Sequence, residues 1–241
     1  MRGALPYRAF RRLAAVAALM ALASCGKGGP HATILYMRER ELGGPPFPTR
    51  IIVTHRFVRI DPDTGTGNYI LFDRRHHVIY SVDKGDHTIL VIRSHLITLP
   101  KPAHFHNVVK PGRVKGRFKG HKLRSFRLFT NDQQCYYIVA AKHLLPGVVS
   151  ALKAYANTLA GEQALTAANT PAGLETKCDL ADNVFDPGRE YSEGFPVRAL
   201  DYEENEKVLT GYKKDVPVKR NLFVLPAHYV QYSPGEVRDG G

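Results

Sequence analysis

The sequence lacks the short motifs on which most catalytic sites depend, and it holds only three cysteines in 241 residues. None of the cysteines lies in a C-x-x-C or C-x-x-C-H pattern, which argues against thiol redox catalysis and covalently attached haem. No G-x-S-x-G, H-E-x-x-H or phosphate-cradling glycine loop is present. The sequence therefore predicts no catalytic site and no cofactor.

The apolar run near the N-terminus is too short to cross a bilayer. Residues 13–23 give 11 apolar residues, whereas a spanning helix needs roughly 20. Four arginines precede the run, as in a secretory signal. Leu22-Ala23-Ser24-Cys25 resembles the lipobox of bacterial lipoproteins, and this resemblance implies cleavage before Cys25 and acylation of that residue. An ordinary signal peptide with a chance cysteine is the alternative.

The chain is strongly basic, with 34 Lys and Arg against 22 Asp and Glu, for a formal charge of +12. Removal of the signal segment with its four arginines leaves about +8 on the mature chain. A basic protein in the cell envelope favours anionic lipid head groups, lipopolysaccharide phosphates or acidic envelope proteins. An exported chain makes nucleic acid a poor candidate partner.

Part of this charge is concentrated in a stretch without acidic residues, from His87 to Asn131. Within it Arg113, Lys115, Arg117 and Lys119 alternate at the period of a strand, which predicts four positive charges on one face. Such a face fits an anionic membrane surface or an acidic partner. It is also typical of a solvated strand or of an edge protected from pairing.

The cysteines predict one disulfide. If Cys25 carries lipid, Cys135 and Cys178 remain as a pair in an oxidising compartment. A bond between them closes a loop of about 43 residues, worth on the order of 3–4 kcal/mol in the chain-entropy model.

Hydrophobic periodicity predicts a mainly β protein with one long helix, in the order strands, helix, strands. The predicted helix spans Pro146 to about Asn169, with apolar residues at i, i+3, i+4 and i+7 spacing. The predicted strands are Thr33–Leu42, Arg50–Ile60, Asn68–Asp73, His77–Val82, Thr88–Arg93, Val114–Phe118, Lys122–Thr130, Gln134–Ala141, Phe195–Tyr202, Glu206–Tyr212 and Lys219–Val224.

Several strands resemble a known superfamily. Asn68–Arg74 followed by Val78–Val82 looks like the paired central strands of LolA/LolB-like envelope proteins. Gly194–Val197 and Phe223–Tyr229 are similar to the closing strands of that superfamily. The resemblance implies an α+β fold in which an antiparallel half-barrel packs on a helix and holds lipid or acyl chains.

Candidate ligand contacts follow from the strands. The run Ile89–Ile92 is apolar on both faces, so it requires cover on both sides, either ordinary core or a bound acyl chain. Strand parity selects Phe72, Tyr80, Ile89 and Val91 as pocket candidates, although the same residues could pack against the helix.

We therefore expect a signal peptide (1–24), a flexible tether (25–32), one β-rich domain (33–233) and a disordered tail (234–241). The expected function is non-catalytic binding of a lipid, acyl chain or lipidated partner. Gly26 lies directly after the cysteine, where an inner-membrane retention signal usually has Asp. In a cell with two membranes this favours anchoring in the outer membrane, facing the periplasm.

Two alternatives stay open. One is an assembly lipoprotein that binds a protein partner through the basic strand. The other is metal binding by His104 and His106, whose H-x-H spacing would place both imidazoles on one side of a strand.

Overall fold

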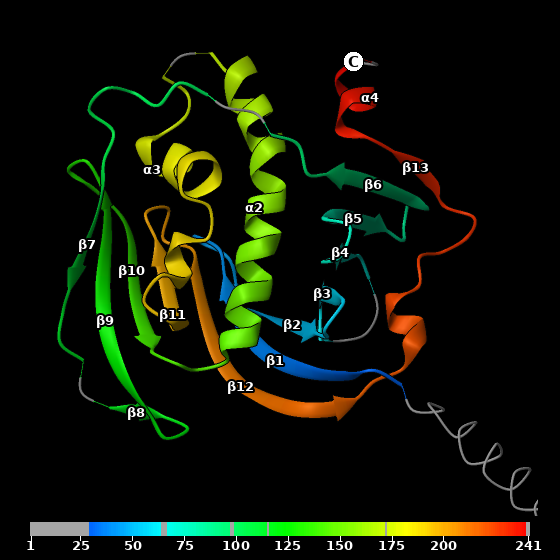
Figure 1. The fold of residues 1–241 in the computed structure, drawn as a ribbon, viewed down its shortest axis with the longest axis horizontal. Coiled ribbons are helices and arrows are strands. Elements are labelled where there is room, and N and C mark those ends of the chain that lie inside the picture. The colour runs from blue at the N-terminus through cyan, green and yellow to red at the C-terminus, as the bar shows by residue number, and fades with distance from the viewer. Residues whose placement is uncertain (1–28, 64–66, 97–98, 115, 172, 240–241) are drawn as a thin grey trace, which may run out of the picture.

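The computed structural model describes residues 29–63, 67–96, 99–114, 116–171 and 173–239 (Figure 1). The predicted signal segment 1–24 and lipidation site Cys25 lie outside the described residues, and so does Lys115 of the predicted basic strand. None of the helices in the described part of the chain is long and apolar enough to cross a membrane.

Thirteen strands form one open sheet. They are β1 (His31–Arg40), β2 (Phe47–Val53), β3 (Phe57–Asp61), β4 (Tyr69–Asp73), β5 (Val78–Asp83), β6 (Thr88–Arg93), β7 (Asn107–Pro111), β8 (Arg117–Phe118), β9 (His121–Thr130), β10 (Gln133–Ala141), β11 (Phe195–Asp201), β12 (Glu206–Pro217) and β13 (Val230–Tyr232). The strand order is β13-β6-β5-β4-β3-β2-β1-β12-β11-β10-β9-β7, with β8 paired to β9. Strand β1 joins the two halves, because it pairs antiparallel with β2 on one side and with β12 on the other.

One long helix and several short ones accompany the sheet. They are α2 (Pro146–Asn169), α3 (Lys177–Asp179), the π-helical turn η2 (Leu180–Phe185), the 3₁₀ turns η3 (Arg189–Tyr191) and η4 (Arg220–Phe223), and α4 (Pro234–Asp239). Figure 1 shows α2 crossing one face of the curved sheet, with α3 and its following turns beside it on the same side.

The expected half-barrel packed on one long helix is wrong. The structure is a single open sheet of thirteen strands, and α2 shares its side of that sheet with α3, η2 and η3. The physical reason lies in the segment around Cys178, which folds into short helices that contact β9, β10 and β11. Thr176 starts this segment with a capping box, in which its side chain accepts from the Asp179 backbone amide and Asp179 accepts from that of Thr176.

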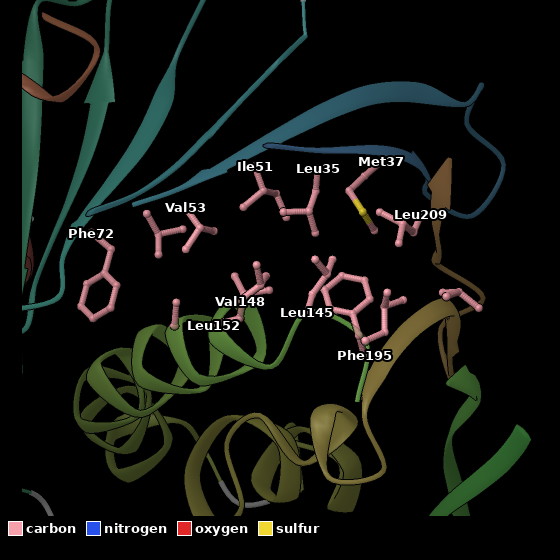
Figure 2. Close-up of a cluster of buried hydrophobic side chains, with 14 of the residues drawn as sticks. Leu35, Met37, Ile51, Val53, Phe72, Leu145, Val148, Leu152, Phe195 and Leu209 are labelled. Carbon is pink, nitrogen blue, oxygen red and sulfur yellow. The ribbon is translucent and has the colours of Figure 1, made fainter. Parts of the chain in front are cut away.

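Helix α2 confirms the predicted helix at both ends. Pro146 occupies the first turn, where its missing N–H costs nothing, and the helix ends at Asn169. The predicted apolar stripe faces the sheet, and Figure 2 shows its Leu145, Val148 and Leu152 pointing toward Leu35 and Ile51. The whole stripe, Leu145, Val148, Val149, Leu152, Tyr155 and Leu159, belongs to this principal core or packs against it.

A second core covers the opposite face of β1 to β6. Ile52, Leu71 and Ile89 are nearly or fully buried there against Val218 and Phe223 from the C-terminal part of the chain. The Phe223 ring stacks on that of Phe57, with 5.4 Å between ring centroids. The chain therefore supplies its own cover for this face.

A buried arginine fastens the C-terminal segment to this second core. The Nε of Arg59 donates to Asp61 at 2.6 Å, and its Nη1 donates to the carbonyl oxygen of Leu222 at 2.8 Å. The guanidinium lies 3.6 Å from the ring centroid of Tyr69. Arg59 is thus paired, hydrogen-bonded and stacked, as a buried charge requires.

Several predicted elements differ from the structure. The expected strand Arg50–Ile60 is two strands, because Thr54 starts a turn in which its Oγ1 accepts from the Phe57 backbone amide at 2.8 Å. The expected strand Lys219–Val224 contains the 3₁₀ turn η4 instead, and the expected disordered tail contains α4. Strands β7 and β13 were not predicted from the sequence.

Candidate functional site: a two-sided cavity between α2 and the sheet

A cavity of about 450 Å³ lies between α2, the turns η2 and η3, and the sheet. Its lining comes from β1 to β4, β10 to β12, α2 and the segment 182–191, so distant parts of the chain meet there. The volume falls within the range of about 300–1,000 Å³ that is usual for small-molecule sites. One side of the cavity is apolar and the other is acidic.

The apolar side follows from strand register. Ile51 lies opposite Ile60, and Ile60 lies opposite Ile70, so three isoleucines form a row across β2, β3 and β4. All three line the cavity. Other apolar lining residues are Met37, Leu152, Tyr155, Leu159 and Phe195. Figure 2 shows Met37, Ile51, Leu152 and Phe195 within the buried hydrophobic cluster that they also belong to.

The acidic side is formed by four carboxylates that line the cavity, Glu39, Asp182, Glu190 and Asp201. Among the described residues, Lys207 is the basic side chain that lines it, 3.9 Å from Glu39. Asp201 accepts hydrogen bonds from the side chain of Asn205 and from two backbone amides of the β11–β12 turn.

Burial dominates the electrostatics of this acidic side. Burial raises the pKa of Asp182 from 3.8 to about 7, although the Arg189 guanidinium opposes the rise. Burial also raises the pKa of Glu190. The pKa of Tyr136 is raised well above 10.0 by burial, and then by the charges of Asp182, Glu190 and Asp201. A carboxyl with a pKa near 7 is able to take up or release a proton at neutral pH.

Arg189 holds Asp182 in place from behind the cavity. This arginine is 4% exposed, its Nε donates to Asp182, and its Nη1 donates to the Thr130 hydroxyl at 2.8 Å. Within the described ranges its Nη2 has no hydrogen-bond partner. The pair links η2 and η3 to the end of β9, which fixes the acidic side relative to the sheet.

The four predicted pocket residues are not brought together. Phe72 is fully buried on the α2 side, where its ring lies 5.8 Å from that of Tyr155. Ile89, Tyr80 and Val91 lie on the opposite face, in the second core beneath the C-terminal segment. Strand parity therefore grouped residues that lie on opposite faces of the sheet. None of the four residues lines the cavity.

The predicted basic strand is not one continuous strand. Arg113 precedes β8, Arg117 lies in β8, and Lys119 lies in the following turn with a φ of 46°. The Nζ of Lys119 donates to the carbonyl oxygen of Tyr212 at 3.2 Å. The turn at Lys119 ends the alternation, so Lys119 does not share a strand face with Arg117.

The histidine and cysteine predictions have different outcomes. His104 and His106 lie in an exposed loop rather than a strand, and in the described part of the chain no group of three or more His, Cys, Asp or Glu residues is placed to hold a metal ion. The predicted Cys135–Cys178 disulfide is confirmed and connects β10 to α3. Both of its cysteines are fully buried.

Comparison with known proteins identifies no family. No family model matches the chain, and no curated protein matches it. Among solved structures, the chain is similar to an uncharacterized conserved protein from Thermus thermophilus, with a TM-score of 0.43 and 8% identity over 91% of this chain and 99% of that one.

Two further solved structures are similar at the same low level. PNGF-II gives a TM-score of 0.45 at 9% identity, with 87% of this chain matching 33% of that one. A LolA superfamily protein from Nitrosomonas europaea gives 0.29 at 8% identity, over 83% of this chain and 92% of that one. The last belongs to the superfamily that the sequence resembles, but likeness this distant assigns neither family nor activity.

The acidic side of the cavity was missed in the sequence. Its carboxylates come from β1, η2, η3 and the end of β11, at positions 39, 182, 190 and 201. No spacing rule joins residues so far apart. Only an indirect sign of the acidic side is present in the sequence. Asp182 and Glu190 lie on either side of Arg189, in a segment that the Cys135–Cys178 disulfide connects to the sheet.

Proposed function

We propose that the protein is a membrane-anchored lipoprotein of the cell envelope that binds a lipid, an acyl chain or a lipidated partner without catalysis. The observation that carries this proposal is the apolar side of the cavity, which is lined by Ile51, Ile60 and Ile70 of the sheet and by Leu152 and Leu159 of α2.

The energetics favour an alkyl ligand. Each buried methylene contributes about 0.8 kcal/mol, so a chain of about ten carbons contributes ~8 kcal/mol. The association cost that this gain opposes runs from about 4 to more than 15 kcal/mol before side-chain ordering. Burial of the alkyl chain therefore offsets a large part of the association cost.

The proposed anchor places one edge of the protein next to the membrane. Five residues lie between Cys25 and His31, so the two are six Cα–Cα steps apart and at most ~20 Å from each other in an extended chain. His31 begins β1 opposite Pro217 of β12, close to the exposed Lys213 and Lys214. Lysines at this position suit anionic head groups, in keeping with the proposed attachment to the periplasmic side of the outer membrane.

The anchor has its own test. Cells expressing the full chain are labelled with radioactive palmitate, and the chain is immunoprecipitated. We expect label on the native chain and none on the Cys25→Ser variant. Label on the variant, or none on the native chain, would refute the lipid anchor while leaving the cavity proposal untouched.

The cavity is tested with a neutral apolar fluorophore. The full chain with Cys25→Ser, purified without detergent, is titrated with N-phenyl-1-naphthylamine, whose fluorescence rises in apolar surroundings. We expect saturable binding that Ala156→Phe abolishes, because Ala156 lines the cavity from α2. Ala168→Phe is the matched control, on the same helix but exposed and outside the cavity.

Native mass spectrometry then identifies the ligand class. A co-purifying mass of fatty-acid or phospholipid size on the native chain, absent from Ala156→Phe, supports the proposal. A bare mass together with no fluorophore binding contradicts it, and the protein would then be better described as an interaction lipoprotein.

A further inference from the structure

The charge of the cavity is opposite to that of the protein. The whole chain carries +12, yet the described residues lining the cavity include four carboxylates and one lysine. Lys207 lies 3.9 Å from Glu39 and its charge also acts on Glu190, while Arg189 pairs with Asp182, so the acidic groups at the cavity still outnumber the basic ones. A site lined in this way repels carboxylate and phosphate groups and attracts cations.

Glu190 is the least satisfied of these carboxylates. In the described part of the chain, no ion pair within 4.0 Å and no hydrogen bond joins it to another side chain; its carboxylate interacts with its own backbone amide, and the charges of Lys207, Arg189 and Lys153 act on it from farther away. Asp182 is paired with Arg189, and Asp201 is held by the β11–β12 turn. Glu190 is therefore the carboxylate left available to a ligand.

Aromatic rings add a second feature that suits a cation. Tyr136 and Tyr191 line the cavity with Glu190, and neighbouring carboxylates raise the pKa of both phenols further than burial alone. Phenol rings present a negative face to an ammonium group, an interaction that strengthens when both partners leave water.

We infer that the ligand is an amphipathic cation, with an alkyl chain along the isoleucine row and a protonated or quaternary amine against Glu190. This inference rests on the proposed function, because it uses the same cavity. It names the polar end of the ligand, which the apolar side alone leaves open. Free fatty acids and other anionic amphiphiles are poor ligands on this reasoning.

Three probes of equal chain length test the inference. Decylamine, decanol and decanoate are titrated below their micelle concentrations into the full chain with Cys25→Ser, by isothermal calorimetry at neutral pH and low salt. We expect decylamine to bind about tenfold more tightly than decanol, and decanoate to bind more weakly than decanol. Added salt should bring the affinity for decylamine closer to the affinity for decanol, because salt screens the charge interaction.

Variants test whether the preference for decylamine over decanol depends on the Glu190 carboxylate. Glu190→Gln should lower decylamine affinity toward that of decanol and leave decanol binding unchanged. Glu41→Gln, at an exposed position outside the cavity, is the matched control and should change neither value. If Glu190→Gln fails to fold by circular dichroism, Glu39→Gln serves as the second charge variant at the same side of the cavity.

The outcomes separate the two proposals. Equal affinities for the three probes, or tighter decanoate binding, overturn the inference while the lipid-binding function stands. Loss of decanol and decylamine binding together in Glu190→Gln also overturns it, since the residue would then be structural. Binding of none of the probes refutes the inference and the proposed function together.

Discussion

The raised pKa of Asp182 makes a prediction about stability against pH. A carboxyl with a pKa of about 7 in the folded chain and 3.8 in the unfolded chain binds more protons when folded across that interval. The free energy of unfolding then falls as pH rises from about 4 to 7, because the unfolded state binds fewer protons. Asp182→Asn removes this titration, so the variant gains stability relative to the native chain as pH rises.

The size of the effect follows from the same two values. The interval is about three pH units, and at about 1.4 kcal/mol per unit the relative change reaches ~4 kcal/mol as an upper bound. The Asp182 side chain is 12% exposed, so solvent screening reduces this little. Asp182→Asn also removes the ion pair with Arg189, which lowers the free energy of unfolding of the variant at high pH. This loss shifts the difference between the two proteins but does not reverse its dependence on pH.

Urea denaturation of both proteins between pH 4 and pH 8, followed by circular dichroism, measures the difference at each pH. Glu190 titrates in both proteins, so most of its contribution cancels in the comparison. Asp86→Asn, at an exposed position, is the matched control. The free energy of unfolding of this variant should differ from that of the native chain by the same amount at every pH. A flat difference for Asp182→Asn, or one that increasingly favours the native chain as pH rises, would refute the reasoning and show that Arg189 outweighs burial.

Two further predictions concern stability. Replacing Cys135 and Cys178 together by alanine should lower the free energy of unfolding by ~4 kcal/mol, because the bond closes a loop with a sequence separation of 43; an unchanged urea midpoint would contradict this. Gly161→Ala should cost more than ~2 kcal/mol, because its Cβ would lie 2.2 Å from the His95 carbonyl oxygen, whereas Gly147→Ala on the same helix meets nothing within 4 Å and should be neutral or stabilising in the same assay.

The parts of the fold that depend on local patterns could be predicted. Helix α2 has the bounds Pro146–Asn169 because its apolar spacing, the first-turn proline and the Asn-Thr-Pro end all lie within one segment. The strands Tyr69–Asp73, Val78–Asp83 and Thr88–Arg93 follow in the same way from alternating side chains and tight turns. The disulfide followed from counting cysteines, which requires no geometry.

Elements that depend on distant partners were predicted wrongly. The segment Lys219–Val224 has the composition of a strand, but η4 forms there because Phe223 has to reach the second core and Leu222 supplies an acceptor to Arg59. The turn at Thr54 carries no glycine or proline, so the run Arg50–Ile60 gave no sign of the break between β2 and β3.

The face of each strand was a harder problem than its position. Phe72 and Leu71 are adjacent residues of β4 on opposite faces, and both faces are buried. Alternation separates the two sets but does not say which set meets α2 and which meets the C-terminal segment. Placing Tyr80 and Ile89 on the correct side requires knowing that Val218–Tyr229 returns to cover them.

The two-sided character of the cavity follows from how the sheet is covered on the α2 side. Two pieces form this cover, since α2 packs over β5 and β6 and the segment 177–191 packs over β9 to β11. The apolar stripe of α2 completes an apolar wall, whereas the second piece carries Asp182 and Glu190. Gly188, with a φ of 74°, lies against α2, where a Cβ would make an ordinary contact of 3.4 Å with Lys153. The cavity therefore lies where two pieces of unlike chemistry meet, which is the arrangement that an amphipathic ligand requires.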